Sequence, residues 1–425
     1  MKRYPILTVL ALSAICLTAC DEDYMAITNP DAGKGKKAET PEYILHPLNW
    51  TSVADSVSSA LVTRFFNQPG AAGVFCKTSY NNLHNNDYFY WQQPHAMAAM
   101  IDWHDRIEQS NPTLAAQLKG YMSDFYSHQG NNWAPARFRG PYGFGNNYSD
   151  DTAWQIIGLL QMYDATGDHR YFEAAEGTWV ECIRPRFARN EYGWLIWLLD
   201  HAQEGKTEKE GNALLACTHG PASICASMLA AYAREAGDNA AYETYFNEAS
   251  RCFDQNLIIM SPLGTVTSPG EVALSYTQGT CMEAGRLLWK LSGEAGYLRK
   301  AIMAARGQMG AEMCEVYKGE FLMRNEGTDY NNAVFHAVWY HWASRMATDR
   351  EIDRIDPTIR QELKTFIQRH CWYYWKEGVN RSDWEDSYFS TTVYRPRAKG
   401  SGGEMGAYAS AAQAMEAMCL IEKEF

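Results

Sequence analysis

The stretch ATGDHRYF at residues 165–172 joins two segments whose apolar residues recur at helical spacing. Gly167 can end the first helix in the left-handed conformation, and Asp168 can then cap the second. The same pair of residue types recurs at Gly237-Asp238 and Gly293-Glu294, so the three glycines are 70 and 56 residues apart. Each interval is long enough for one helical hairpin with its loops. The repeat therefore predicts a stack of helical hairpins.

Helical periodicity continues along the chain from about residue 50 to the end, while alternating strand patterns are short and lie in loops rich in Gly, Asn and Pro. Twelve helices in six hairpins can close into a toroid, so we predict an all-α (α/α)6 barrel. An open solenoid and an irregular helical bundle are the alternatives. The helices are expected near residues 51–66, 92–107, 112–127, 150–166, 168–188, 220–236, 239–256, 277–291, 294–313, 330–347, 356–377 and 405–422.

The first twenty residues, MKRYPILTVLALSAICLTAC, combine a basic start with an apolar run that is too short to span a bilayer as a mature helix. The run ends in a sequence that resembles a bacterial lipobox, which implies cleavage after residue 19 and a lipid on Cys20. An ordinary signal peptide is the alternative. Residues 20–45 form a polar tether, which begins with the acidic run DED, and residues 46–425 form the folded domain. We expect a lipoprotein of the cell envelope, in the outer membrane.

Charge and cysteine content exclude several function classes. Removal of residues 1–19 leaves 36 basic against 50 acidic residues, a formal charge of −14, which disfavours nucleic acid as a partner. Nine cysteines follow Cys20, without a C-x-x-C pair, zinc spacing or a nucleotide-binding fingerprint. We therefore predict no cofactor and no metal, and we expect the chain to act as a monomer.

Two consecutive aspartates, Asp150 and Asp151, stand where an apolar helical stripe begins. Acidic residues at this position suit the free N–H groups and the positive dipole end of a helix, so capping is the simplest interpretation. Neighbours within a helix diverge by about 100°. A residue at the helix start lies outside helical geometry, however, so both carboxyl groups can face one cleft. The pair then provides one acid and one base, because the charge on one carboxylate raises the pKa of the other.

Aromatic residues gather in the Asn- and Gly-rich loops around this pair. Core packing explains any single tryptophan, but rings in loops, interleaved with Asn, Gln and Arg, are typical of a sugar-binding cleft. The clusters comprise Tyr88, Phe89, Tyr90 and Trp91; Trp133, Phe138 and Tyr148; and Tyr192, Trp194 and Trp197.

The chain after the tether resembles glycoside hydrolase family 76, the endo-acting α-1,6-mannanases. The most specific element is Asp-Asp followed by Trp in YSDDTAW at residues 148–154, supported by YWQQPHA at 90–96 and YTQGT at 276–280. The chain departs from the family's pattern at three places. Gly193-Trp194-Leu195-Ile196-Trp197 replaces the family's Gly-Gly-Ile-Trp-Trp, Thr218-His219 replaces the Ser-Asn of Cys-Ser-Asn-Gly-Pro, and Thr277 replaces an Asn. These affect contacts with the sugar chain and leave the aspartates intact.

The resemblance implies a retaining endo-α-1,6-mannanase in which Asp150 is the nucleophile and Asp151 the acid/base, and whose partner is α-mannan or a mannooligosaccharide. Retention requires two carboxyl groups about 5–5.5 Å apart. A glycan-binding lipoprotein on a former hydrolase barrel, and an (α/α)6 glycosidase or lyase of other specificity, are the alternatives. We expect sugar contacts from Trp91, His95, Arg137, Tyr148, Trp154, Trp194, Tyr276, Gln278 and Asp329. His95 can instead be a hydrogen-bonded histidine at a helix start, Gln278 and Asp329 can be caps, and Arg137 can pair with an acid.

Overall fold

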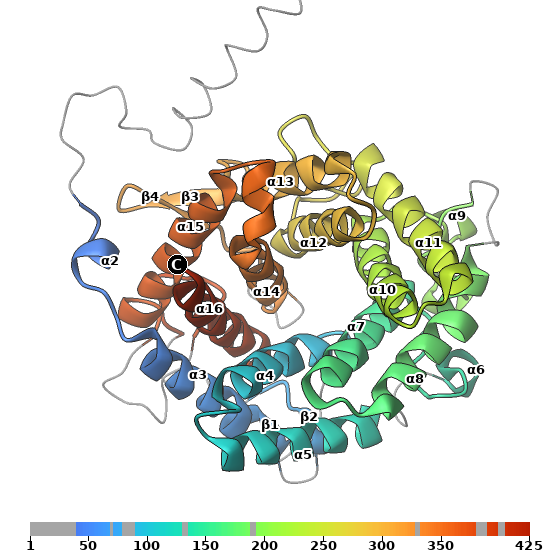
Figure 1. Cartoon of the computed structure of the whole chain (residues 1–425), viewed down its shortest axis with the longest axis horizontal. Coiled ribbons are helices and arrows are strands. Elements are labelled where there is room, and N and C mark those ends of the chain that lie inside the picture. The colour runs from blue at the N-terminus through green and yellow to red at the C-terminus, as the bar shows by residue number, and fades with distance from the viewer. Residues whose placement is uncertain are drawn as a thin grey trace, which may run out of the picture.

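The computed structural model describes residues 40–68, 71–78, 90–129, 135–187, 193–327, 332–379, 389–397 and 404–425. Cys20 and Asp329 lie outside these ranges, so the structure gives no view of the predicted anchor or of one predicted sugar contact. Within the described residues all twelve predicted helices are present, in two concentric rings (Figure 1). The predicted all-α (α/α)6 barrel is therefore confirmed.

The inner ring runs in chain order around the barrel axis, and each inner helix except the last is followed in sequence by an outer one. Inner helices are α4 (Gln93–Ile107), α7 (Ser149–Thr166), α10 (Ala216–Glu235), α12 (Ser275–Ser292), α14 (Phe335–Thr348) and α16 (Met405–Glu424). Outer helices are α3 (Trp50–Phe65), α5 (Pro112–Gln129), α8 (His169–Thr178), α11 (Asn239–Ile258), α13 (Ala295–Met309) and α15 (Ile359–Lys376).

The ring closes through the two ends of the domain. Consecutive helices form five hairpins, but the sixth pair joins α16, the last helix, to α3, the first of the twelve, and α16 also packs on α4 (Figure 1). At this junction the Ser58 hydroxyl donates to Glu416 Oε1 at 2.6 Å, and Arg106 Nε donates to Glu416 Oε2 at 2.6 Å. Glu416 of α16 thus connects the last helix of the barrel to both α3 and α4.

The predicted turns, in which a glycine ends one helix and an acidic residue caps the next, are largely confirmed. Gly167, Gly237 and Gly293 all have φ between 70° and 76°, the left-handed conformation that lets an inner helix end sharply. The Asp168 and Asp238 side chains accept N–H bonds at the starts of α8 and α11. Glu294 does not, so the prediction of a side-chain cap is wrong for α13.

Some predicted boundaries differ from the structure. The helix expected to continue to residue 188 is regular only to Thr178, and the chain goes on as a π-helix (Trp179–Ile183) and a 3₁₀ turn (Arg184–Arg186). Helix α10 begins four residues before the predicted start at residue 220 and contains Pro221. Two short hairpins were not predicted: β1 (Phe66–Gln68) pairs with β2 (Ala71–Phe75), and β3 (Cys314–Tyr317) pairs with β4 (Glu320–Met323), both antiparallel.

Small residues allow the inner helices to approach closely. A Cβ atom at Gly279 would lie 2.9 Å from Trp339 Cα, and one at Gly220 would lie 2.3 Å from Thr280 Oγ1. Both distances are below van der Waals contact, so α12 can pack this tightly on α14 and α10 only because these positions carry no side chain. One long apolar helical segment, Glu208–Glu235, has the length and composition of a membrane span, but 72% of its most apolar window is buried inside the barrel.

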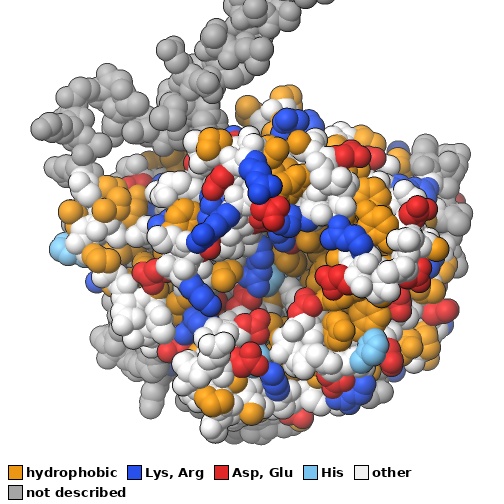
Figure 2. Space-filling view, in the orientation of Figure 1, with side chains coloured by type: hydrophobic (Ala, Val, Ile, Leu, Met, Phe, Trp, Pro, Cys, Tyr) orange, Lys and Arg blue, Asp and Glu red, His pale blue; other side chains and the backbone are white. Residues whose placement is uncertain are grey.

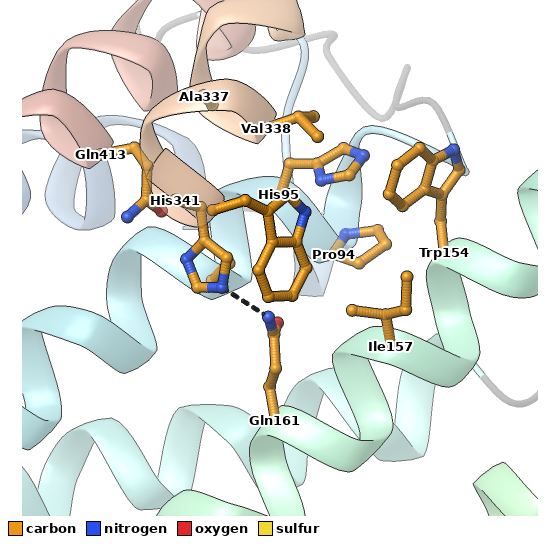
Figure 3. A pocket seen from close by; sticks show the side chains of 11 residues that line it. Pro94, His95, Trp154, Ile157, Gln161, Ala337, Val338, His341 and Gln413 are labelled. Atoms are coloured by element: carbon orange, nitrogen blue, oxygen red, sulfur yellow. Dashed lines mark hydrogen bonds between the residues drawn. The ribbon is translucent and has the colours of Figure 1, made fainter. Parts of the chain in front are cut away.

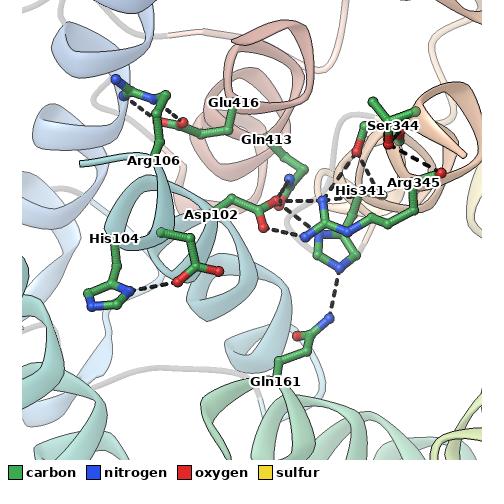
Figure 4. Close-up of polar contacts among 11 residues, drawn as sticks. Asp102, His104, Arg106, Gln161, His341, Ser344, Arg345, Gln413 and Glu416 are labelled. Carbon is green, nitrogen blue, oxygen red and sulfur yellow. Dashed lines mark hydrogen bonds and ion pairs between the residues drawn. The ribbon is translucent and has the colours of Figure 1, made fainter. Parts of the chain in front are cut away.

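A polar cluster joins three neighbouring inner helices (Figure 4). Asp102 of α4 accepts hydrogen bonds from Arg345 and His341 of α14 and from Gln413 of α16. Burial opposes ionisation of this carboxyl, but the Arg345 and His341 contacts hold the pKa of Asp102 well below its usual value. The charged group therefore ties three inner helices together.

The predicted tether also contributes to the folded structure. Its last residues form the short helix α2 (Glu42–Leu45), which packs against α15 and buries Tyr43. On the face of the barrel shown in Figure 2, basic and acidic side chains are interspersed.

Candidate active site

A cavity of about 1070 Å³ opens at one end of the barrel, where the first turns of inner helices converge. Five of the six inner helices bring residues to it from their N-termini or from the residues just before them. The positive ends of these helix dipoles favour negative charge in the cavity. Its lining residues are Tyr90, Trp91, Tyr148, Asp150, Asp151, Trp154, Trp197, Leu215, Cys217, Glu271, Val272, Leu274, Tyr276, Arg324, Asn325, Glu326, Asn332 and Phe335.

The loop that leads into α7 is held in place by hydrogen bonds from a buried arginine. Arg186, 1% exposed, donates to Asn146 O at 2.6 Å and to the Ser149 hydroxyl at 2.9 Å. Ser149 in turn donates from its hydroxyl to Ile196 O at 2.6 Å and from its backbone N–H to Trp197 O at 2.8 Å. These bonds hold the first turn of α7 and the Trp197 segment together at the mouth of the barrel.

Asp150 and Asp151 are the second and third residues of α7, which begins at Ser149. The expectation that one of them lies outside the helix is wrong, and the preceding Tyr148 provides no side-chain cap. Both carboxyl groups still line the cavity, because the cavity surrounds the end of the helix. The structure therefore brings the predicted pair together at the cavity wall without an irregular backbone.

The surroundings of Asp150 both oppose and favour its ionisation. Burial raises the pKa of this carboxyl above its ordinary value, although the Cys217 thiol, the backbone N–H groups of the first turn and the Trp197 indole act in the opposite direction. N–H and S–H groups that point at a carboxylate stabilise its charge. Of the two carboxyl groups, Asp150 is thus the one that the protein equips to carry the negative charge.

Asp151 lies in a less favourable place for charge. Burial, the neighbouring Asp150 and Glu204 all raise the pKa of Asp151 well above its ordinary value. Glu204 is held nearby because its carboxylate accepts the Tyr148 hydroxyl at 2.9 Å and the Asn147 amide at 2.9 Å. Of the pair, Asp151 is therefore the carboxyl group whose protonated form the surroundings favour more strongly, and one protonated and one charged carboxyl group is the division that acid/base chemistry on a glycosidic bond requires.

Aromatic rings line the cavity on the side of α4 and α14. Tyr276 stacks on Phe335 with ring centroids 4.5 Å apart, and Phe335 lies 5.7 Å from Trp91. Trp154 lines the cavity next to the aspartates, one turn further along α7. Apolar ring faces beside carboxyl and amide groups suit a sugar, which has flat C–H faces and polar edges.

His95 lies behind this wall rather than in it. Its ring contacts Trp91 and Trp154 edge-on, with centroids 5.7 Å and 4.4 Å away. It lines a separate space of about 10 Å³ beneath Trp154, together with Gln161 and His341, which are joined by a 2.8 Å hydrogen bond (Figure 3). Burial and the nearby His341 lower the pKa of His95 to about 3, so the ring is neutral. The structure gives His95 the role of a support for two tryptophans.

Three other predicted sugar contacts do not line the cavity. Arg137 pairs with Asp200 at 3.0 Å on the surface, and the Trp194 indole donates to Asn212 O at 2.9 Å. Gln278 is buried and bonds both to the N–H and to the carbonyl of Val266, each at 2.8 Å. Gln93 binds the backbone of Phe75 in the same way, so one glutamine holds a loop and the other holds strand β2 against an inner helix. Trp91, Tyr148, Trp154 and Tyr276 do line the cavity.

Several lining residues were not predicted as site residues. Trp197 was visible as part of an aromatic cluster, and Cys217 precedes the altered family motif, so both carried a sequence signal. Glu271, Arg324 and Glu326 carried none, because each is a lone charged residue in a loop. Among the described residues, no group of three or more His, Cys, Asp or Glu side chains is arranged to hold a metal ion.

The barrel, with an acidic pair at its mouth and aromatic walls, defines the class of (α/α)6 proteins that act on sugars. Comparison gives the particular family: the model of glycosyl hydrolase family 76 matches residues 49–424, and the chain belongs to that family. It is therefore a glycoside hydrolase by family. No curated protein matches the chain.

Solved structures share the fold at low sequence identity. One is an inactive variant of the α-1,6-mannanase GH76A of Salegentibacter sp. HEL1_6, in which two consecutive aspartates are replaced by alanine, in complex with α-1,6-mannotetrose. It is 20% identical to this chain with a TM-score of 0.69, and the match covers 88% of this chain and 100% of that one. A family 76 glycoside hydrolase (mannosidase) from Bacteroides thetaiotaomicron VPI-5482 is 15% identical with a TM-score of 0.66, covering 89% and 100%. Dfg5 from Chaetomium thermophilum, in complex with glucosamine, is 14% identical with a TM-score of 0.63, covering 88% and 91%.

Proposed function

We propose that this protein is a retaining, endo-acting hydrolase of α-1,6-linked mannan backbones. The observation that carries the proposal is the pair Asp150-Asp151 in the first turn of α7, at the wall of a cavity lined by aromatic rings, with the pKa of Asp151 raised further than that of Asp150. The volume of about 1070 Å³ lies at the upper end of the range for ligand cavities, which suits a chain of several sugars. The Salegentibacter α-1,6-mannanase, inactive without two consecutive aspartates, supports both the substrate and the pair.

In the proposed reaction the Asp150 carboxylate attacks the anomeric carbon, and the glycosidic bond breaks as Asp151 gives its proton to the leaving oxygen. Water then attacks the resulting glycosyl ester. Asp151 takes a proton from that water, and Asp150 leaves as a carboxylate. The donors around Asp150 stabilise its charge before attack and after release, while burial, the charge of Asp150 and Glu204 favour the protonated form of Asp151 for the first step.

The test uses the soluble domain and unbranched α-1,6-mannan. Endo cleavage yields a ladder of mannooligosaccharides at early times, and retention gives the α-anomer as the first product in a proton NMR time course. Release of mannose alone would indicate an exo-acting enzyme, and an initial β-anomer would exclude Asp150 as a nucleophile. Binding without any product would favour the alternative of a glycan-binding protein.

We further propose that the enzyme is attached to the cell envelope through a lipid on Cys20 and acts as a monomer. The lipobox-like sequence before Cys20 supports the anchor. The described residues begin on the outside of the barrel, where α2 packs against α15 (Figure 1). Cell fractionation and sedimentation velocity test these two statements.

A further inference from the structure

Two further carboxyl groups, Glu271 and Glu326, line the cavity, and Glu326 takes no part in the proposed reaction. Its side chain is only 3% exposed and follows β4 in the loop that precedes α14. Glu326 Oε1 accepts the backbone N–H of Ser275 at 2.6 Å, and Oε2 accepts the Ser275 hydroxyl at 2.6 Å. A buried carboxyl group with two such short bonds to one residue is built to hold that residue in place.

Ser275 is the first residue of α12, and this helix lacks a cap of its own. Leu274 precedes it in an extended conformation and provides no side-chain hydrogen bond. Glu326 therefore supplies, from a distant loop, the acceptor that a capping side chain would provide. The residue next to Ser275 is Tyr276, whose ring lines the cavity and stacks on Phe335. The bond to Ser275 thus fixes one edge of the aromatic wall.

The groups that face Glu326 leave its charge only partly compensated. Burial raises the pKa of Glu326 to about 7, against the Ser275 bonds and Arg324, which lower it. The Arg324 guanidinium is itself bound to the carbonyl oxygens of Ala273 and Glu312. On α14, burial lowers the pKa of His336 to about 4, so this ring is neutral. Tyr276 of α12, Cys314 of β3 and Tyr374 of α15 also face the carboxyl group, and all have raised pKa values that keep them uncharged.

His336 offers a place for the proton that Glu326 takes up. Its Nε2 is buried without a hydrogen-bond partner and lies 3.6 Å from Glu326 Oε2. The other ring nitrogen bonds to the backbone of Arg324, which makes Nε2 the acceptor. A protonated Glu326 can therefore turn its O–H toward His336 and weaken its hold on the Ser275 hydroxyl.

We propose that Glu326 is a positioning residue of the sugar-binding cleft, which caps α12 through Ser275 and so fixes the Tyr276–Phe335 ring pair against the substrate. The inference rests on the proposed function for the identity of the ligand. It adds that sugar affinity is highest when Glu326 is ionised, because the ionised carboxylate holds Ser275 most firmly.

The test compares Glu326→Gln, which keeps the shape but cannot ionise, with Ser275→Ala, which removes the hydroxyl. Ser58→Ala is the matched control, because it removes a Ser–Glu hydrogen bond of the same length, 2.6 Å, outside the cavity. Two measurements are made on the folded variants: amide hydrogen exchange of residues 275–280 at pH 8, and calorimetric binding of α-1,6-mannotetraose at pH 6 and pH 8.

We expect faster exchange at the start of α12 in Glu326→Gln and Ser275→Ala, and affinity at pH 8 reduced about five-fold, the scale of one lost hydrogen bond. Wild type should bind more tightly at pH 8 than at pH 6, whereas Glu326→Gln should lose this difference. Ser58→Ala should match wild type in both readouts. Unchanged exchange and affinity in the first two variants would overturn the proposal.

Two further outcomes keep the two proposals separate. If wild type binds no mannotetraose, the proposed function fails, while the exchange measurement still decides whether Glu326 holds α12. If Glu326→Gln does not fold, Ser275→Ala decides the question, since its smaller change leaves the carboxyl group in place.

Discussion

Replacement of Asp151 by Asn tests the proposed acid/base more sharply than loss of activity alone. The amide keeps the size of the carboxyl group but cannot deliver a proton. General acid–base catalysis contributes about 10²- to 10⁴-fold, so the rate on mannan should fall by that factor. A substrate with an activated aryl leaving group needs little protonation. It should therefore keep its first step, and added azide should restore turnover as α-mannosyl azide.

The same substitution should also change how the free energy of unfolding depends on pH, in the direction opposite to that expected for the loss of a helix-capping aspartate. The pKa of Asp151 is raised in the folded protein, from an ordinary value of 3.8. The wild-type protein should therefore be fully stabilised below about pH 4 and lose about 1.4 kcal/mol for each pH unit above it, until the folded pKa is passed. Asp151→Asn lacks this loss. Relative to wild type, the variant should therefore gain stability as the pH rises from 4 to 8.

Urea denaturation of both proteins at several pH values, with parallel rate measurements, provides the assay. The slope of the stability difference against pH is the relevant quantity, because burial of the amide adds an offset that does not depend on pH. A helix-capping aspartate has a depressed pKa and would give the opposite slope. That result, or full activity of Asp151→Asn, would refute the reasoning.

Three more predictions test other parts of the molecule. Trp91→Ala should weaken mannotetraose binding by at least about 1 kcal/mol in calorimetry, whereas Trp194→Ala should have little effect, because the Trp194 ring does not line the cavity. Cys20→Ala should move the protein from the membrane fraction to the soluble fraction of cells; an unchanged distribution would place the anchor elsewhere. Gly264→Ala should lower the free energy of unfolding by more than about 2 kcal/mol, because Gly264 has a φ of 91° and a Cβ there would lie 2.1 Å from Met303 O. The control is Gly270→Ala, which has a similar φ of 84° but lies in open space and should cost about 1 kcal/mol. Equal losses in the two variants would contradict the steric argument.

The barrel could be predicted from the sequence because the patterns that indicate its helices and turns are local. Helical periodicity and glycine turns depend on a few neighbouring residues, and Gly167, Gly237 and Gly293 adopt the conformation that their positions require. Glu294 shows the limit of such a rule, because an acidic residue at the right position does not have to form the bond. The closure of α16 on α3 could not be read from any local pattern, since it joins the two ends of the domain.

The site was predictable where residues cluster in sequence and not where the fold assembles them. Asp150 and Asp151 are adjacent, and the structure brings both to the cavity. Gln278 was expected to meet sugar, but the structure uses its amide to bind Val266, and nothing in YTQGT distinguishes the two roles. Glu326 was missed because its function depends on Ser275, 51 residues earlier in the chain.

The junction between α3 and α16 sets an order of events during synthesis of the chain. The Ser58–Glu416 bond spans 358 residues, so the ring stays open until the last helix has been made, although each hairpin can form as it emerges. Helix α16 also brings Gln413 to the buried Asp102 of α4. A chain that lacks this helix would expose the inner faces of α3, α4 and α14, and proteases should remove it rapidly. Catalytic competence is thus acquired late, when the final twenty residues complete the barrel.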